Sequence, residues 1–173
     1  MLLFPIESVR ILDTQRLHLR KFAPNDAEDL VELFGDVEVM RFLQGVKTRL
    51  EIEQWLTLVF ESYRKKNFGP WAILSKNKSG LMGYCGLYLQ QNVDGRNEIE
   101  LLYSLKKRYW GKGYATEAAR AVHQYGRTQL GLTRFVSLVA AGNIASTAVA
   151  KKVGMTMEKE IVMWGRTCHL YSI

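Results

Sequence analysis

Long apolar runs are absent from this sequence, and its short apolar start, residues 1–6, is interrupted by Pro5. A helix that spans a bilayer needs about 20 consecutive apolar residues, so we expect no membrane partner. The N-terminus also lacks the basic segment followed by an apolar segment that marks a secretory signal. Together these absences predict a cytoplasmic protein.

Cysteine and histidine are scarce, with two and three copies in 173 residues. Cys85 and Cys168 form no C-x-x-C pair and are typical of buried free thiols, which agrees with a reducing cytoplasm. The scattered histidines and cysteines show no spacing typical of metal ligands. We therefore expect no bound metal.

Acidic residues are fewer than basic ones, 17 against 24, which gives a net charge of +7 and a pI near 9.5. Basic domains often bind nucleic acid, but here the Lys and Arg residues are dispersed. The densest clusters are residues 64–66, typical of a solvated helix end, and residues 106–108, which directly precede a glycine pair. We expect no nucleic acid as the main partner; a basic ribosome- or RNA-binding protein remains the alternative.

Hydrophobic residues make up 47% of the chain, enough for one full-sized core. No repeat or linker interrupts the pattern, so we predict one domain over residues 1–173, with its core at about 14–172. The residue patterns predict the order β-α-α-β-β-β-α-β-α-β-β, hence an α/β fold (α+β type) with a mixed sheet of about seven strands and about four helices. The predicted strands cover 16–20 (at a sheet edge), 71–75, 82–90, 99–105, 134–140, 155–161 and 168–173; the predicted helices cover 27–34, 48–66, 114–130 and 143–152, with a helical turn within 37–43.

Turn and cap residues sharpen these boundaries. The turns at 76–80 and 92–97 predict that the strands between 71 and 105 form an antiparallel meander. Pro24-Asn25-Asp26 supplies the predicted N-cap of the first helix, and Thr48 with Glu51 forms a capping box for the second. Asn143 is the predicted N-cap of the last helix, which Gly154 ends.

Two glycines, Gly111 and Gly113, lie between the strand that ends at Leu105 and the helix that begins at Tyr114. Such a junction exposes backbone N–H groups at the positive end of a helix, which suits a phosphate or pyrophosphate. Glycine also allows positive φ and close approach of a ligand to the backbone. By itself the glycine pair is equally compatible with a tight turn that binds nothing.

Four ordered motifs, however, resemble the GNAT N-acetyltransferases, in particular their RimJ/RimL-like branch of ribosomal-protein N-terminal acetyltransferases. The resemblance covers nearly the whole chain. The motifs are Thr14-x-Arg16-Leu17-x-Leu19-Arg20 followed by Asp26, then Glu100-x-x-Tyr103-x-Leu105, then Arg108-x-x-Gly111-x-Gly113 continuing to Ala118, and Asn143-x-x-Ser146 followed by Lys152-x-Gly154.

The resemblance implies direct transfer of an acetyl group from acetyl-CoA to a primary amine, either a protein N-terminal α-amine or a small amine. It places the pyrophosphate on the loop amides and the pantetheine arm along the strand that ends at Leu105. There the strands carrying Glu100 and Phe135 splay apart, and a backbone N–H near Leu102 or Tyr103 would polarise the thioester carbonyl. The implied cofactor-binding residues are Leu102, Tyr103, Leu105, Arg108, Tyr109, Trp110, Gly111, Lys112, Gly113, Tyr114, Ala115, Asn143 and Ser146.

Glu100 is the implied general base, acting directly or through water. The alternatives are that it is an exposed carboxylate on a polar strand face, or that Glu98 or solvent takes the proton. Many GNATs place a tyrosine acid where this chain has Ala150, so Ser146 becomes the implied hydrogen-bond donor to the CoA sulfur. Ser146 and Asn143 are also explained as local caps, and Tyr103 and Trp110 as core aromatics.

An α-amine, with a pKa of about 8, is easier to deprotonate with one carboxylate than lysine, whose pKa is about 10.4. The resemblance places the acceptor between residues 35–47 and the last two strands, which contribute Phe42, Gln44, Trp164, Arg166 and His169. No acidic cluster there suits a polycation, whereas an acidic protein partner suits the basic surface. A non-catalytic acyl-CoA sensor remains an alternative function, and we expect a monomer or a homodimer.

Overall fold

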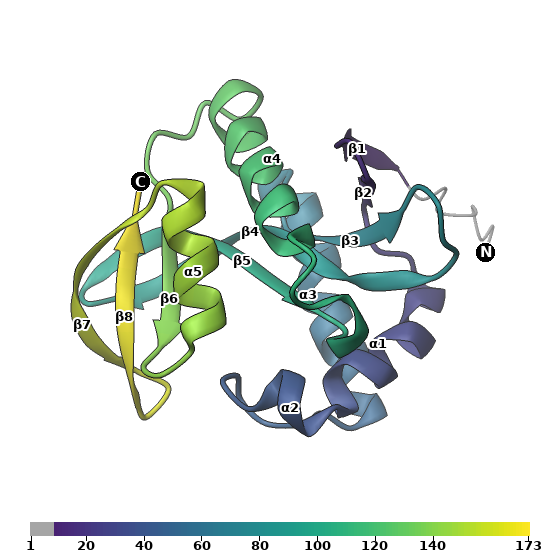
Figure 1. Cartoon of the computed structure of the whole chain (residues 1–173), viewed down its shortest axis with the longest axis horizontal. Coiled ribbons are helices and arrows are strands. Elements are labelled where there is room, and N and C mark those ends of the chain that lie inside the picture. Colours follow the sequence, from purple (N-terminus) through teal and green to yellow (C-terminus); the bar gives the residue numbers. More distant parts are fainter. Residues whose placement is uncertain (1–8) are drawn as a thin grey trace.

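An eight-stranded mixed sheet forms the middle of the molecule (Figure 1). The computed structural model describes residues 9–173. The strand order is β1-β2-β3-β4-β5-β6-β8-β7, and every neighbouring pair is antiparallel except β5 and β6. The strands are β1 (Arg10–Asp13), β2 (Leu17–Arg20), β3 (Pro70–Ser75), β4 (Leu81–Val93), β5 (Arg96–Leu105), β6 (Val136–Ala140), β7 (Thr156–Met163) and β8 (Arg166–Ser172).

The predicted mixed sheet and the antiparallel meander of β3, β4 and β5 are confirmed. The prediction that residues 16–20 form an edge strand is wrong, because β1 pairs with β2 and takes the edge. β1 has the sequence Arg-Ile-Leu-Asp, in which the two apolar residues are adjacent and do not alternate with polar ones as they do in β2. Its pairing with β2 therefore decides its structure, and the sheet has eight strands in place of about seven.

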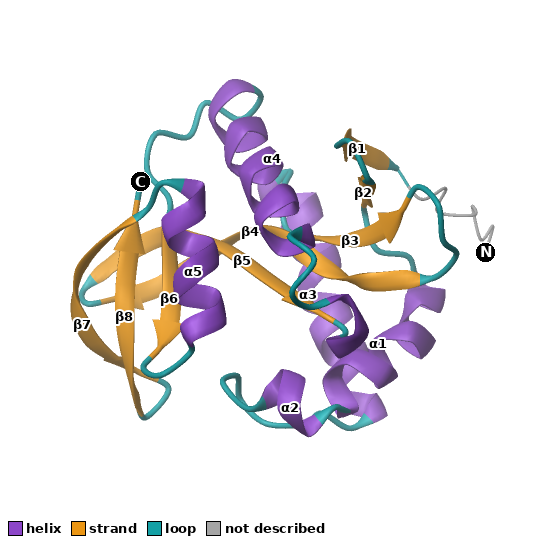
Figure 2. Ribbon diagram, viewed as in Figure 1, coloured by secondary structure: helices purple, strands orange, loops and turns teal. Residues whose placement is uncertain are grey.

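Helices cover both faces of the sheet (Figure 2). α4 and α5 lie on one face, with α4 packed against β4 and β5, and α1 and α3 lie on the other. The α-helices are α1 (Ala27–Gly35), α2 (Val37–Met40), α3 (Arg49–Lys66), α4 (Tyr114–Thr128) and α5 (Ile144–Val153). No helix within residues 9–173 has both the length and the apolar character needed to cross a membrane.

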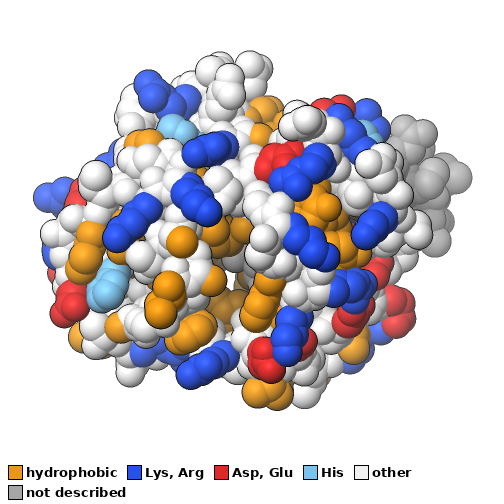
Figure 3. Space-filling view, in the orientation of Figure 1, with side chains coloured by type: hydrophobic (Ala, Val, Ile, Leu, Met, Phe, Trp, Pro, Cys, Tyr) orange, Lys and Arg blue, Asp and Glu red, His pale blue; other side chains and the backbone are white. Residues whose placement is uncertain are grey.

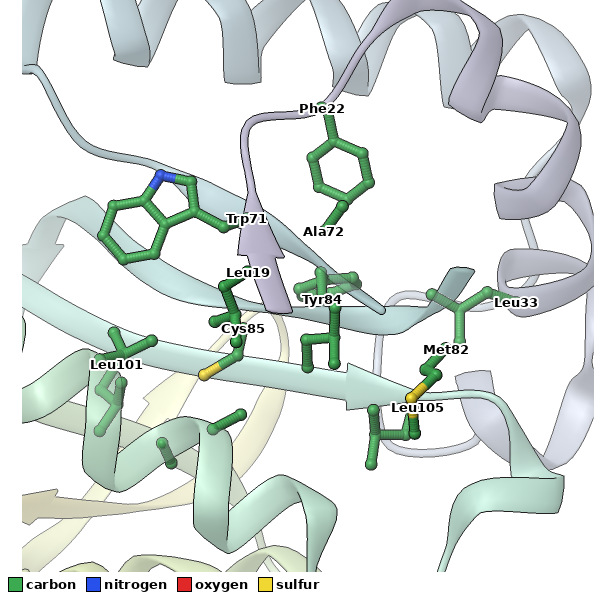
Figure 4. Packing of buried hydrophobic residues seen from close by; sticks show 14 of the residues in the cluster. Leu19, Phe22, Leu33, Trp71, Ala72, Met82, Tyr84, Cys85, Leu101 and Leu105 are labelled. Carbon is green, nitrogen blue, oxygen red and sulfur yellow. The ribbon is translucent and has the colours of Figure 1, made fainter. Parts of the chain in front are cut away.

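Small residues allow α4 to approach the sheet closely. Ala118 and Ala119 are fully buried, and a Cβ added to Gly126 would lie 2.6 Å from the ring of Phe135. Buried side chains on both sides of the strands, including Trp71 and Phe22, then join the layers into one core (Figure 4). This packing fixes β5, which carries the predicted base, between two helical layers.

The caps of α3 and α5 agree with the predictions. The hydroxyl of Thr48 accepts the N–H of Glu51, whose carboxylate accepts the N–H of Thr48 at 2.7 Å. Asp26 is different, because a 3-10 turn (Pro24–Asp26) begins two residues earlier. Asp26 is the N-cap residue of α1 as predicted, but its carboxylate does not cap that helix; it accepts the N–H of Ala23 at 2.8 Å and pairs with Arg20 at 2.7 Å.

The parallel strands β5 and β6 separate almost immediately. Their register contains one pair, Glu100 with Val136, and a side-chain contact follows in which the Ser137 hydroxyl donates to the carbonyl of Leu101 at 2.7 Å. Beyond this point the sheet divides into a β1–β5 part and a β6–β8–β7 part (Figure 1). The predicted splay is therefore confirmed.

Candidate active site

A cavity of about 390 Å³ lies where β5 and β6 separate. On the face in Figure 3 the molecule is hollowed near its middle, with hydrophobic side chains around the hollow. The cavity walls come from β5, β6, the start of α5, the segment after α2, and the β7–β8 turn. Of the predicted site residues, the walls include Phe42, Gln44, Glu100, Leu102, Tyr103, Asn143, Ser146, Trp164 and Arg166, but not Leu105, His169 or the glycine loop.

Glu100 is the only carboxylate among the residues that line this cavity. Its side chain is 9% exposed, so the alternative of an exposed carboxylate on a polar strand face is wrong. Burial raises the pKa of Glu100 from 4.5 to about 7, although the backbone N–H of Leu138 acts in the opposite direction. A carboxylate with a pKa near neutrality is well matched to accepting a proton from an amine.

Glu98, two residues earlier on β5, is engaged elsewhere. Its carboxylate pairs with Arg134 at 3.1 Å, and the same guanidinium pairs with Glu158 of β7 at 2.8 Å. Glu98 does not line the cavity. This ion pair connects β5 to the segment before β6, close to the point where the two strands still touch.

The glycine loop ends with α4, whose first turn has no side-chain cap. Gly111 and Gly113 have φ values of 71° and 80°, a left-handed conformation that costs other residues energy. Within the described residues, none of the backbone N–H groups of residues 111–116 has a hydrogen-bond acceptor. Six free amides at the positive end of a 15-residue helix form a surface that fits a phosphate or pyrophosphate.

Arg16, which directly precedes β2, contacts this loop, a role that the sequence motif containing it did not indicate. Its guanidinium donates to the carbonyl of Lys112 at 3.0 Å, pairs with Glu117 at 2.6 Å, and lies 4.4 Å from the ring centre of Tyr114. Arg16 and Glu117 each lie in a family motif, but they are about a hundred positions apart in the sequence. Only their contact shows that β2 supports the loop.

The basic residues predicted beside the glycines are directed away from the free amides. Arg108 pairs with Glu32 of α1, and Lys112 donates to the carbonyl of Arg108 at 2.8 Å. Tyr109 and Trp110, the two aromatic residues directly before the glycines, hold the start of the loop in place. Tyr109 is buried, and the Trp110 indole donates to the carbonyl of Leu105 at 2.7 Å.

The direction of each backbone N–H group shows whether Leu102 or Tyr103 could polarise the thioester carbonyl. Alternate residues of a strand direct their N–H groups to opposite neighbours. Lys106 donates its N–H to Met82 on β4, so the N–H of Leu102 also faces β4. The N–H of Tyr103 faces the other side, where β6 has already separated from β5. Tyr103 is therefore the residue that presents a free N–H to the gap.

Ser146 lies at the start of α5, across the gap from β5. Its backbone N–H donates to Oδ1 of Asn143 at 3.1 Å, and its carbonyl accepts the Tyr103 hydroxyl at 3.0 Å. Ser146 lines the cavity, and its side chain lies beside the Tyr103 hydroxyl, whose pKa burial raises and this contact lowers. Ala150, one turn later, is 1% exposed in the core. Asn143 is thus confirmed as a cap, and of Ser146 and Ala150 only Ser146 brings a hydroxyl to the cavity.

The residues predicted to hold the acceptor line one part of the cavity, with the exception of His169. Phe42 and Gln44 face Trp164 and Arg166 across it, and Lys47 lines it as well. His169 does not line it, and its ring pairs with Glu160 at 3.2 Å instead. Arg166 and Cys168 share one face of β8, so His169, the residue directly after Cys168, points to the other face.

Comparison with known proteins agrees with the family resemblance found in the sequence. Residues 16–156 match the family model described as an acetyltransferase (GNAT) domain. Two Bacillus subtilis proteins, uncharacterized protein YkkB and uncharacterized N-acetyltransferase YoaA, are each 32% identical to this chain; the alignments cover 92% and 86% of it and 93% and 84% of the relatives. The fold also matches RimL, a ribosomal L7/L12 α-N-protein acetyltransferase solved with coenzyme A, with a TM-score of 0.78, 16% identity, and coverage of 95% and 97%.

Proposed function

This chain belongs to the GNAT acetyltransferase family, and from that premise we propose that it transfers an acetyl group from acetyl-CoA directly to a primary amine, either a protein N-terminal α-amine or a small amine. The observation that carries the proposal is the cavity at the β5–β6 gap. It contains one buried carboxylate, Glu100, whose pKa is raised to about 7. A non-catalytic acyl-CoA sensor would have no use for a carboxylate held there at an energetic cost.

The free amides of residues 111–116 would hold the pyrophosphate of acetyl-CoA, and Arg16 would keep their loop in place. The strand edge between Glu100 and Leu105 would guide the pantetheine arm toward the cavity. Acetyl-CoA supplies the acetyl group as an activated thioester. The remaining chemistry falls to three groups of this chain, Glu100, the N–H of Tyr103 and the hydroxyl of Ser146.

Glu100 accepts the proton that the acceptor amine must lose, directly or through one water molecule. The N–H of Tyr103 stabilises the carbonyl oxygen as the amine nitrogen bonds to the carbonyl carbon. Ser146 donates a hydrogen bond to the sulfur as the carbon–sulfur bond breaks, and solvent supplies the final proton. Tyr103 does not act as this acid, because burial raises the pKa of its hydroxyl and Ser146 accepts that hydrogen bond.

Calorimetric titration with acetyl-CoA, followed by a thiol-release assay over a panel of amines, tests the proposal. We expect acetyl-CoA to bind and free thiol to appear only with an acceptor present. Binding without thiol release for any amine would indicate the sensor. Salt-dependent binding to RNA without binding to acetyl-CoA would indicate the basic RNA-binding protein.

We also propose a cytoplasmic location, which the two buried free thiols, Cys85 and Cys168, support. For the assembly state we propose a monomer or a homodimer, which light scattering on the purified protein would measure.

We expect Ser146→Ala to lower kcat by roughly ten- to a hundredfold, because a neutral hydrogen bond to a developing charge contributes about 1–3 kcal/mol. The affinity for acetyl-CoA should change little, since this hydrogen bond strengthens as the sulfur gains charge. Steady-state kinetics and calorimetry measure the two quantities. Thr147→Val, on the same helix but away from the cavity, is the matched control. If Ser146→Ala lost stability or cofactor affinity and kept its turnover, Ser146 would be a structural cap only.

A further inference from the structure

Two basic side chains in the cavity have no ionic partner. Lys47 and Arg166 both line it and are half-buried, and neither forms an ion pair within residues 9–173. Elsewhere near the site, by contrast, the basic residues are paired, such as Lys106 with Asp29 and Arg134 with Glu98. The cavity therefore keeps two positive charges available where a substrate would bind.

Both cations are on firmly held segments. Lys47 directly precedes the Thr48 cap of α3, and its N–H donates to the carbonyl of Phe34 at 3.0 Å. Arg166 begins β8, immediately after a two-residue turn made by Trp164 and Gly165. Trp164 has φ 51° and its side chain is 45% exposed, although it lines the cavity. Trp164 and Gly165, with φ of 51° and 72°, both have the left-handed conformation that a two-residue hairpin turn requires, so the turn fixes the backbone next to Arg166.

The charges of Arg166 and Glu100 both act on the thiol of Cys168. Burial raises the pKa of Cys168, the next cavity residue on β8; the charge of Arg166 lowers it and that of Glu100 raises it. A substrate amine beside Glu100 thus lies in a cavity that also exposes two cations. A simple alkylammonium would be repelled by them, whereas an amine that carries its own anion would be attracted.

Resting on the function proposed above, we propose that the acceptor carries an anionic group, carboxylate or phosphate, close to its reactive amine. Arg166 and Lys47 bind this group and determine specificity, with Arg166 suited to a two-point hydrogen bond to a carboxylate or phosphate. Trp164 offers an aromatic surface to the rest of the acceptor. Free amino acids, amino-sugar or amino-alcohol phosphates, and proteins with an acidic second residue share this chemistry.

The test is kcat/KM over matched acceptor pairs with saturating acetyl-CoA. The pairs are amino acids against their primary amides, O-phosphoserine against serine, and tripeptide amides with Asp against Asn at position two. We expect the anionic member of at least one pair to be preferred by about tenfold or more. The pair with the largest preference identifies the source of the anion.

Arg166→Gln and Lys47→Gln should each lower kcat/KM for the anionic member about tenfold and leave the neutral member within about twofold. Arg127→Gln and Lys78→Gln, exposed substitutions outside the cavity, are the matched controls. Calorimetry should give the same affinity for acetyl-CoA in every variant. Equal use of both members of all pairs, or an unchanged preference in both variants, would overturn the inference.

A second readout separates this inference from the proposed function. N-acetylated amino acids and their amides are titrated into the protein in the presence of coenzyme A. Stronger binding of the carboxylates, lost in Arg166→Gln, supports the anion site even if no panel member is acetylated. Absence of thiol release with every amine contradicts the acetyltransferase function, and equal binding of carboxylate and amide, together with equal binding of N-acetyl-O-phosphoserine and N-acetylserine, contradicts the anion site.

Discussion

Glu100→Gln should lower kcat/KM by at least about a hundredfold, which is the usual effect of removing a general base. The amide keeps the shape of the side chain and cannot accept the proton. In the parent protein kcat/KM should rise through about pH 7, because Glu100 must be ionised to act and its pKa is raised to about 7. The variant should lose this rise and keep only the rise that belongs to the acceptor amine. A pH–rate profile from pH 6 to 9 with a true substrate measures both.

The same substitution should stabilise the fold above neutral pH. The pKa of Glu100 is about 7 in the folded protein and 4.5 in the unfolded chain, so between these values only the unfolded chain loses the proton. Stability therefore falls as the pH rises from about 4.5 to 7, in total by about 3 kcal/mol. Glutamine carries no such cost. Denaturant unfolding should show Glu100→Gln more stable than the parent at pH 8, with the difference vanishing near pH 4.

Glu98→Gln is the matched control, because Glu98 is on the same strand but pairs with Arg134 outside the cavity. We expect it to keep the parent pH–rate profile and to lose some stability. An unchanged rate for Glu100→Gln across the whole pH range would transfer the role of base to Glu98 or to solvent. Loss of activity in Glu98→Gln, with its pH dependence near 7 removed, would favour Glu98.

The second large effect is expected at the glycine loop. Gly113→Val should weaken acetyl-CoA binding by at least about a hundredfold, because the free amides would no longer converge on the pyrophosphate and hydrogen bonds to a charged group contribute about 1.5–3 kcal/mol each. The substitution acts through the backbone conformation at residue 113 and not through steric crowding. Gly113 has φ 80°, which a β-branched residue disfavours, while an added Cβ would meet only Arg16 at 3.5 Å. Calorimetry with acetyl-CoA measures the effect.

Gly131→Val provides the control, since Gly131 follows the other end of α4, has φ 66°, and has open space around it. Both variants should lose similar stability, and only Gly113→Val should lose the cofactor. If Gly113→Val bound acetyl-CoA as tightly as the parent protein, the loop would not be the pyrophosphate site.

Local signals in the sequence determined most of the elements. The capping box at Thr48, the cap at Asn143 and the glycine at 154 act within one helical turn, so they remain visible without the rest of the fold. The same holds for the glycine loop, because left-handed residues before a helix need no tertiary partner. The alternation of β5 also placed Glu100 on a definite strand face.

Tertiary structure decided what local signals could not. β1 shows no alternation and forms because β2 is there to pair with it, which in turn removes β2 from the edge. Arg16 supports the glycine loop through Glu117, and Lys47 enters the cavity because the segment after α2 lies across it from β8. The pairing of β1 with β2 is local, but the other contacts join residues far apart in the sequence, where no periodicity connects them.

Glu100 shows most clearly which properties the sequence determined and which the tertiary structure decided. The sequence by itself determined that a carboxylate stands on the strand leading to the glycine loop. Whether it was an exposed surface group or a base with a pKa near 7 depended on burial by walls from β6, β8 and the segment after α2. Desolvation is a property of everything that surrounds a charge, so only the packed structure could determine it.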